Sequence, residues 1–219
     1  STFEGEDEIA AAVHKALSPR HKQLTILVPR HPDRADTIEA MLEARGLKVA
    51  RRSRGDLIEP STDVYLGDTI GEMGLFLNLT DIVFVGKSLK GGGGQNPLEP
   101  AMLGCAVLSG SNVENFRESY ARLLKNGGAR YVRDGEMLAK AVHFLLSNPQ
   151  ARQTMAEGGD KTLRSPTVLV AIFRHPVRSA LALRLGLWPR RAPHNGPPSP
   201  QGGSRTGHMR RQFHRRRLR

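Results

Sequence analysis

Short apolar runs that alternate with longer amphipathic segments constrain the fold of this chain more than any other feature. The runs occupy residues 24–29, 47–51, 62–66, 81–85, 104–110 and 129–132. Apolar runs of this length, bounded by polar turns, are typical of buried parallel strands, and the segments between them are long enough for helical crossovers. The pattern predicts an α/β fold, a Rossmann-like doubly wound parallel sheet with helices on both faces.

The spacing of apolar residues and the residues at segment ends locate the helices. We expect helices over about residues 5–17, 33–46, 113–124, 135–147 and 149–158. Asp33 is predicted to cap the second of them. Thr69 and Glu72 fit a capping box for a helix that follows the third strand, and a ligand contact for Glu72 is an equally weighted alternative.

Charge divides the chain into two parts. Residues 1–162 hold 20 Lys and Arg against 21 Asp and Glu, whereas residues 163–219 hold 13 Arg with no Lys and no acid. The pI of about 10.6 therefore belongs to the end of the chain. We expect one folded domain over 1–161 and a disordered Arg/Pro/Gly-rich tail over 162–219, because the tail's composition cannot bury a core.

Two interpretations of the tail remain open. The first is an out-of-frame translation of G/C-rich coding sequence, whose codons over-produce Arg, Pro, Gly and Ala. The second is a genuine tail that binds nucleic acid or an anionic membrane, as a non-enzymatic basic module. Of the two partners considered for a genuine tail, nucleic acid is less favoured than an anionic membrane.

The cysteine count and the lengths of the apolar stretches indicate in which cellular compartment we expect the chain. Cys105 is the single cysteine of the chain, so no internal disulfide is possible. It lies in an apolar run and is expected to be a buried strand residue. No run reaches the roughly 18 apolar residues that a membrane helix needs. The start is acidic and has no Met, so the beginning of the chain is expected to be missing, and the chain itself is expected to be soluble and cytoplasmic.

The stretch from Gly91 to Met102, GGGGQNPLEPAM, is the strongest candidate for a binding site. Four glycines allow positive φ angles and let the backbone approach a ligand closely, although such runs are also linkers. Asn96 at the N-cap and Pro97 at the first helical position predict a helix start. Glu99 then falls in the first turn, where its carboxylate can accept hydrogen bonds from ribose hydroxyls.

Two further loops follow predicted strands. Arg30 and His31 come directly after the first strand, where α/β sheets hold ligands, so they are candidates for phosphate or carboxylate contacts as well as for a solvated turn. The loop Gly67–Met73 follows the third strand. Loops at the carboxyl ends of neighbouring parallel strands are expected to converge with the glycine loop on one crevice.

The motifs VPRHPDR, VYLGDTIGEMG and DIVFVGKSL, followed by QNPLEPAMLGCAVL, resemble the carboxyl-terminal half of the 3-deoxy-D-manno-octulosonic acid (Kdo) transferases in order and spacing. The resemblance covers residues 1 to about 160. STFEGEDE is similar to the family's S-T-H-E-G-E-E, with Phe3 where many members carry His. The resemblance implies that residues 1–161 are the nucleotide-sugar-binding, donor-side domain of a GT-B glycosyltransferase of lipopolysaccharide core biosynthesis.

The resemblance also implies roles for particular residues. Arg30 and His31 would lie near the phosphate or carboxylates of the donor, CMP-Kdo. Gly71, Glu72 and Met73, with Thr69 in the same loop, would approach the CMP moiety. Ser88 would flank the donor, Asn96 would hydrogen-bond it and Glu99 would hold the ribose. Family enzymes need no metal, and no cofactor is expected.

The resemblance implies that catalysis uses parts that we expect this sequence to lack. The resemblance implies that a hydroxyl of the lipid A precursor, lipid IVA, attacks the donor at the cytoplasmic face of the bacterial inner membrane, with a general base from the amino-terminal domain. No catalytic residue is therefore expected in this chain, which would bind the donor without transferring sugar. Another GT-B donor domain and a nucleotide-sugar epimerase are alternatives that share the fold and the ribose-holding glutamate.

Overall fold

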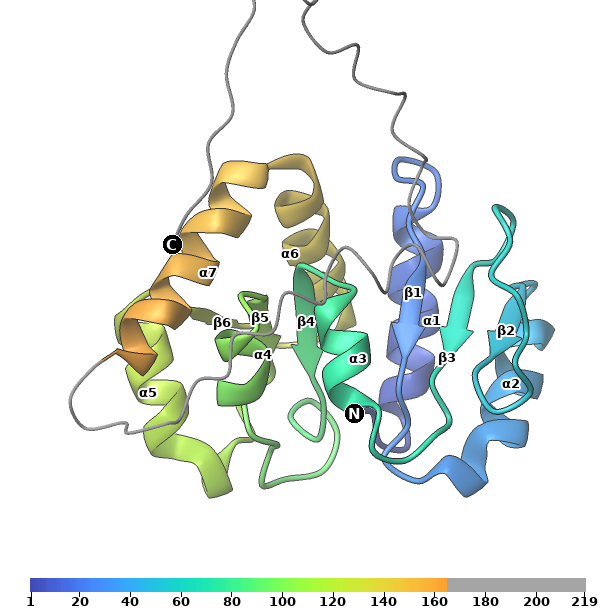
Figure 1. Ribbon diagram of the computed structural model, residues 1–219, viewed down its shortest axis with the longest axis horizontal. Helices are drawn as coiled ribbons and strands as arrows, with labels where there is room; N and C mark the ends of the chain where they lie inside the picture. The colour runs from blue at the N-terminus through green and yellow to red at the C-terminus, as the bar shows by residue number, and fades with distance from the viewer. Residues whose placement is uncertain (165–219) are drawn as a thin grey trace, which may run out of the picture. The chain divides into compact units, whose positions relative to one another are not determined.

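The computed structural model describes residues 1–164 (Figure 1). Residues 165–219, which contain nearly all of the predicted basic tail, lie outside the described residues, so both interpretations of the tail stay predictions. The described elements are, in chain order, α1 (Glu6–Leu17), β1 (Thr25–Leu27), η1 (Pro32–Arg34), α2 (Ala35–Ala44), β2 (Val49–Arg51), β3 (Val64–Leu66), α3 (Met73–Asn78), β4 (Ile82–Val85), α4 (Leu98–Met102), β5 (Ala106–Ser109), η2 (Glu114–Phe116), α5 (Arg117–Lys125), β6 (Ala129–Tyr131), α6 (Gly135–Ser147) and α7 (Pro149–Leu163).

Six parallel strands form two three-stranded sheets. The first has the order β2-β3-β1 and the second β4-β5-β6. Parallel strands with helical crossovers confirm the predicted α/β class, but the expected continuous sheet is interrupted, since β1 and β4 share no ladder. Their facing edges instead line a mainly apolar cavity of about 680 Å³.

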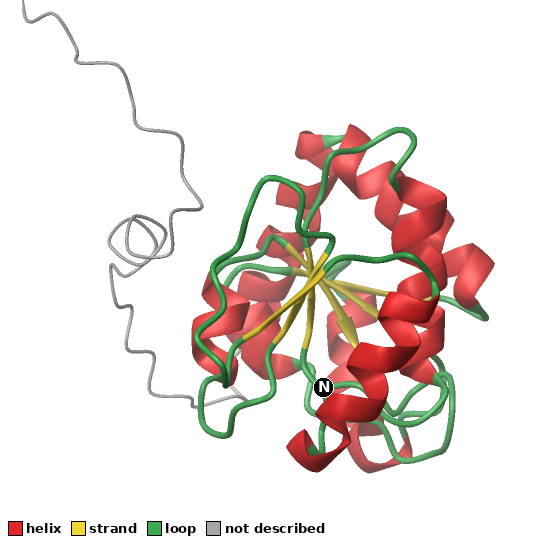
Figure 2. Ribbon diagram, turned by 90° about the vertical axis from the view of Figure 1, so that its right-hand side faces the viewer, coloured by secondary structure: helices red, strands yellow, loops and turns green. Residues whose placement is uncertain are grey.

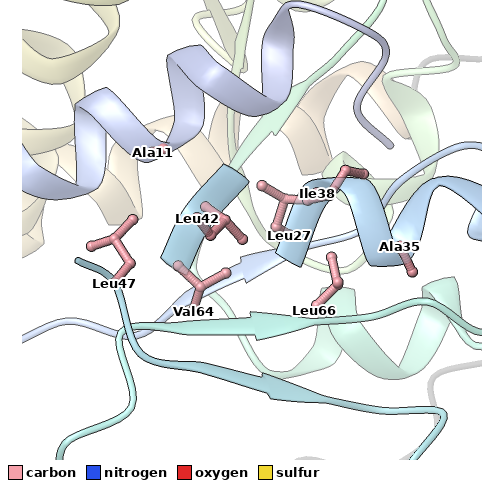
Figure 3. Close-up of a cluster of buried hydrophobic side chains, with 8 residues drawn as sticks. All are labelled: Ala11, Leu27, Ala35, Ile38, Leu42, Leu47, Val64 and Leu66. Carbon is pink, nitrogen blue, oxygen red and sulfur yellow. The ribbon is translucent and has the colours of Figure 1, made fainter. Parts of the chain in front are cut away.

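Helices cover both faces of the first sheet. Ala11 of α1 and Ile38 and Leu42 of α2 pack on one face against Leu27 and Leu66 (Figure 3). Tyr65 points to the opposite face, where it packs with Phe76 of α3. Because side chains alternate along a strand, the three apolar residues of β3 can all be buried only in a three-layer arrangement.

The second sheet is also covered on both faces (Figure 2). Val107 packs with Leu123 of α5 and Leu163 of α7. Its neighbour Leu108 faces the other side, toward α6, where Ile9 and Val13 of α1 join the cluster. Helix α1 therefore contributes to the cores of both sheets and spans the interruption between β1 and β4.

Most predicted helix and strand positions are confirmed, and three details differ. Asp33 does not cap α2, because a short 3₁₀ helix, η1, precedes it and Arg34 takes the N-cap position. Helix α7 passes the expected domain boundary at 161, because Thr162 and Leu163 are 1% and 4% exposed and belong to the core. Cys105 is buried, as predicted, but it precedes β5 instead of lying in a strand.

Candidate functional site

The first three residues lie beside the carboxyl end of β1. Thr2 forms a parallel bridge with Pro29, and its N–H donates to the carbonyl of Val28 at 2.9 Å. On the other side, a Cβ atom on Gly86 would lie 2.1 Å from the carbonyl oxygen of Ser1. Only glycine therefore fits at the end of β4, where the backbone of residues 1–3 passes. Figure 1 shows the N-terminus near the tips of β1 and β4.

The carboxylate of Glu6 holds the loop after β4. Glu6 is 1% exposed and lies in the first turn of α1. It accepts five backbone N–H groups at 2.7 to 3.5 Å, those of Phe3, Lys87, Ser88, Leu89 and Lys90. Successive N–H groups that converge on one point form an anion-binding concavity, and here an internal carboxylate occupies it. This contact fixes the path of the chain into the glycine run.

Its neighbour Asp7 holds the loop after β1. Asp7 is also 1% exposed, and its Oδ2 atom accepts a 2.6 Å hydrogen bond from Arg34. Its Oδ1 atom is buried without a partner among the described residues. Two adjacent acids in one helical turn thus tie down two of the three loops that sequence analysis singled out.

The glycine run has a packed half and an open half. Gly93 and Gly94 have positive φ, and a Cβ atom on either would come within 3.0 Å of Asn115 or Val113. A Cβ on Gly91 would meet nothing within 4 Å. The second half of the run therefore packs against the loop after β5, which excludes a free linker, while the first half stands open to a ligand.

Arg30, His31 and Glu99 are exposed at the same end of the strands. Arg30 lies in the loop after β1 and Glu99 in the first turn of α4, and both segments contact residues 1–2: the Arg30 N–H donates to the carbonyl of Thr2 at 3.0 Å and the Gln95 side chain to that of Ser1 at 2.6 Å. Among residues 1–164, neither the Arg30 guanidinium nor the Glu99 carboxylate has a hydrogen bond or ion pair within the protein. Both charged groups are therefore accessible, and their predicted contacts with a ligand stay predictions.

Ser88 and Asn96 make internal contacts. The Ser88 hydroxyl is buried, donates to the carbonyl of Val85 at 2.6 Å and accepts from the N–H of Gly110 at 2.8 Å. Asn96 accepts the N–H of Leu98 at 3.0 Å, so it caps α4, although Pro97 rather than Asn96 holds the N-cap position. Ser88 is thus turned inward, and Asn96 keeps its side-chain amide nitrogen exposed.

The loop after β3 is held by Arg52, which lies in the loop after β2. Arg52 forms two hydrogen bonds with the Glu72 carboxylate, at 3.0 and 2.7 Å, and the Thr69 hydroxyl donates to the same carboxylate. These bonds lower the pKa of Glu72 from 4.5 to about 2, with Arg52 the main cause. The predicted capping box is wrong, because Glu72 itself takes the N-cap position of α3 and Thr69 bonds its side chain.

Gly71 and Met73 border the same loop. Gly71 has a φ of 84°, and no atom lies within 4 Å of the place where its Cβ would be. Met73 lines the cavity between β1 and β4. The loop therefore presents open backbone at Gly71 and an apolar side chain at Met73, while Glu72 is turned toward Arg52.

Sequence reasoning missed two contributors. The Phe3 ring meets the His31 ring edge to face, with centroids 6.0 Å apart, and Lys87 Nζ lies 5.2 Å from the Phe3 centroid. Lys87 follows β4 as Arg30 follows β1, and that position is the signal that could have identified it. No group of three or more potential metal ligands occurs in the described part of the chain, and none of its helices is long and apolar enough to cross a membrane.

Comparison with known proteins identifies 3-deoxy-D-manno-octulosonic acid transferases as relatives. No family model matches the chain. The chain is 37% identical over 165 residues to a 3-deoxy-D-manno-octulosonic acid transferase of Haemophilus influenzae, covering 74% of this chain and 39% of that protein. For the transferase of Bordetella pertussis the identity is 38%, covering 72% of this chain and 38% of the relative. The chain thus spans about two fifths of the length of these relatives.

Solved structures agree. The crystal structure of the C-terminal CMP-Kdo binding domain of WaaA from Acinetobacter baumannii has a TM-score of 0.71 and 32% identity, covering 75% of this chain and 86% of that one. The C-terminal domain of a group 1 glycosyl transferase, LpcC from Francisella tularensis, has a TM-score of 0.54 and 16% identity, and supports the fold alone.

Proposed function

This chain belongs to the Kdo transferase family of glycosyltransferases and matches a carboxyl-terminal domain of it, and from that premise we propose that it binds CMP-Kdo as the donor half of such an enzyme. The observation that carries the proposal is the match to a CMP-Kdo binding domain over 86% of that domain's length. The contacts that the segments carrying Arg30 and Glu99 make with residues 1–2 support it, namely Arg30 N–H to the carbonyl of Thr2 and the Gln95 side chain to the carbonyl of Ser1.

The donor's parts correspond to groups available at the strand ends. Arg30 and His31 offer cationic contacts to the phosphate or sugar carboxylate. The Glu99 carboxylate, which has no partner among the described residues, accepts from ribose hydroxyls, and Asn96 donates through its side-chain nitrogen. Gly71 and Met73 border the nucleotide, whereas Thr69, Glu72 and Ser88 act indirectly by holding the loops in place.

The reaction follows from the chemistry of the donor. A hydroxyl of the lipid A precursor attacks the anomeric carbon of Kdo, the bond from that carbon to the phosphate oxygen breaks, and CMP leaves with the electron pair. A general base of a separate acceptor domain takes the hydroxyl proton. Arg30 and His31 offset charge that develops on the leaving phosphate, so the step needs no metal. We place the complete enzyme at the cytoplasmic face of the inner membrane, and we expect residues 1–219 alone not to transfer sugar.

Titration calorimetry of the full chain with CMP, UDP and GDP tests the donor class. We expect measurable binding of CMP, weaker binding of the other two nucleotides, and loss of CMP binding in Glu99→Ala and Asn96→Ala. Glu118→Ala, which removes a carboxylate on the surface of α5, serves as the control for net charge. A folded sample that gives no heat with CMP, or equal affinity for all three nucleotides, would overturn the proposal.

A further inference from the structure

Lys87 has an unusual backbone conformation. Its φ of 57° makes it the only non-glycine residue with positive φ among residues 1–164. For an L-residue with a long side chain this left-handed conformation is unfavourable, and glycine adopts it at no such cost. Residues held in such conformations cluster at functional sites, so the conformation of Lys87 indicates a candidate functional residue.

The surrounding contacts fix both ends of Lys87. Its N–H donates to Glu6 at 2.7 Å, which holds the backbone in place. Its ammonium lies 5.2 Å from the centroid of the Phe3 ring, an arrangement typical of a cation–π contact. The edge of the same ring meets His31. Lys87 Nζ has no carboxylate partner among the described residues, so its charge is not neutralised within them.

Three cationic or potentially cationic side chains therefore surround residues 1–3. Arg30 and His31 approach from the end of β1, and Lys87 approaches from the end of β4, with Phe3 between His31 and Lys87. Arg30 also donates its N–H to the carbonyl of Thr2 at 3.0 Å, which keeps that loop against the same segment. A bound anion would offset the repulsion between these like charges.

We propose that Lys87 is a ligand-contacting residue that completes, with Arg30 and His31, a subsite for an anionic oxygen group of the donor, and that Phe3 positions its ammonium. This inference rests on the proposed donor-binding function and adds a residue to it. The anionic group is either the phosphate of the nucleotide or the carboxylate of the sugar, since both offer oxygen acceptors to an ammonium group. Glycine would adopt this backbone conformation with less strain. A ligand contact of the Lys87 ammonium accounts for a lysine at this position.

Two substitutions separate binding from backbone strain. Lys87→Ala removes the ammonium and keeps a Cβ in the left-handed conformation, whereas Lys87→Gly removes both. We expect each to weaken binding of whichever ligand carries the contacted anion, CMP or free Kdo, by about tenfold, the loss expected for one charge-assisted contact. We expect Lys87→Gly to melt about 2 °C or more above Lys87→Ala, because the strain is relieved. Lys125→Ala, at the exposed end of α5, controls for the change of net charge.

Titration of the full chain with cytidine, CMP and free Kdo distinguishes the two anionic groups. A loss of affinity for CMP, with cytidine binding unchanged, assigns Lys87 to the phosphate. A loss confined to Kdo assigns it to the carboxylate. Unchanged affinity of both variants for CMP and Kdo overturns the inference, and so does affinity that recovers in Lys87→Gly, since Lys87 would then act only through the backbone. If the unsubstituted chain does not bind CMP, the donor-binding function fails first, and the Kdo titration alone tests the subsite.

Discussion

The carboxylate of Glu6 and the N–H of Ser88 lie 3.0 Å apart although 82 residues separate them in the sequence. Four more amides share this carboxylate, so the first turn of α1 acts as the support of the loop that leads into the glycine run. Sequence periodicity identified the helix but could not identify this role, because a carboxylate near a helix start is explained equally well by the helix dipole.

Glu6→Gln is expected to destabilise the domain by about 3 kcal/mol, because an amide cannot accept as many N–H groups and directs its own N–H group toward donors. Urea denaturation followed by circular dichroism measures this loss. Glu8→Gln, on the exposed side of the same turn, is the matched control and should change stability by less than about 0.5 kcal/mol. Equal effects of the two substitutions would show that the contact contributes little.

The Glu72 carboxylate should make stability depend on pH in the acid range. Its pKa of about 2 in the folded protein lies below its ordinary value of 4.5. The ion pair with Arg52 therefore stabilises the fold fully above pH 4.5, and this contribution is lost as the pH falls toward 2. Because both side chains are about 30% exposed, we expect a contribution of about 1 kcal/mol.

Thermal melts of the unsubstituted chain and of Glu72→Gln between pH 2 and pH 7 measure this contribution. The difference in stability between the two proteins should be largest near neutral pH and vanish near pH 2. A difference that stays constant across this range would contradict the assignment of the low pKa to Glu72.

Arg51 should be far more sensitive to substitution than other arginines. Its guanidinium contacts three carboxylates, those of Asp36, Glu39 and Asp68, and the Asp68 side chain is 1% exposed. Arg51→Met leaves the buried charge of Asp68 without its ion pair, although hydrogen bonds from Ser53 remain, so we expect a loss of about 3 kcal/mol. Arg122→Met breaks the exposed pair with Glu118 and should cost less than about 0.5 kcal/mol in the same denaturation experiment.

Two glycines in helices should respond to alanine in opposite directions. A Cβ atom on Gly158 of α7 would lie 2.4 Å from the carbonyl oxygen of Asn126, where backbone meets backbone. Gly158→Ala should therefore cost about 2 kcal/mol or more. Around Gly74 of α3 there is open space, so Gly74→Ala should stabilise by about 0.5 kcal/mol through helix propensity. Melting temperatures that shift in the same direction for both would contradict this account.

Local sequence patterns predicted most of the fold because helix and strand formation depends largely on the residues within each segment. The bounds of α6 agree with the apolar spacing over residues 135–147, since Asp134 caps its first turn at Met137. Helix α7 was predicted too short because its last turn is buried by contacts with Asn126 and Arg122, which are distant in sequence. Patterning within a segment carries no information about such contacts.

The site was predicted less completely than the fold. Arg30, His31 and Glu99 are exposed at the strand ends as expected, because strand order alone brings those loops together. Glu72 and Ser88 lie in the expected loops, but internal partners take up the Glu72 carboxylate and the Ser88 hydroxyl. These pairings depend on rotamers and on residues from other strands, and no spacing rule gives them. The position of Lys87 after β4 could have identified it from the sequence, whereas its left-handed backbone is a property of the folded loop.

The interruption between β1 and β4 has a consequence for how the domain opens. No ladder of main-chain hydrogen bonds transmits stability from one three-stranded sheet to the other. The two sheets are connected through α1, whose side chains pack in both cores. Its first turn also bonds the loops after β1 and β4, through Asp7 and Glu6. Amide hydrogen exchange should therefore resolve two cooperative units that share this helix as their common border. A ligand held at once by Arg30 and Glu99 would slow exchange in both units together.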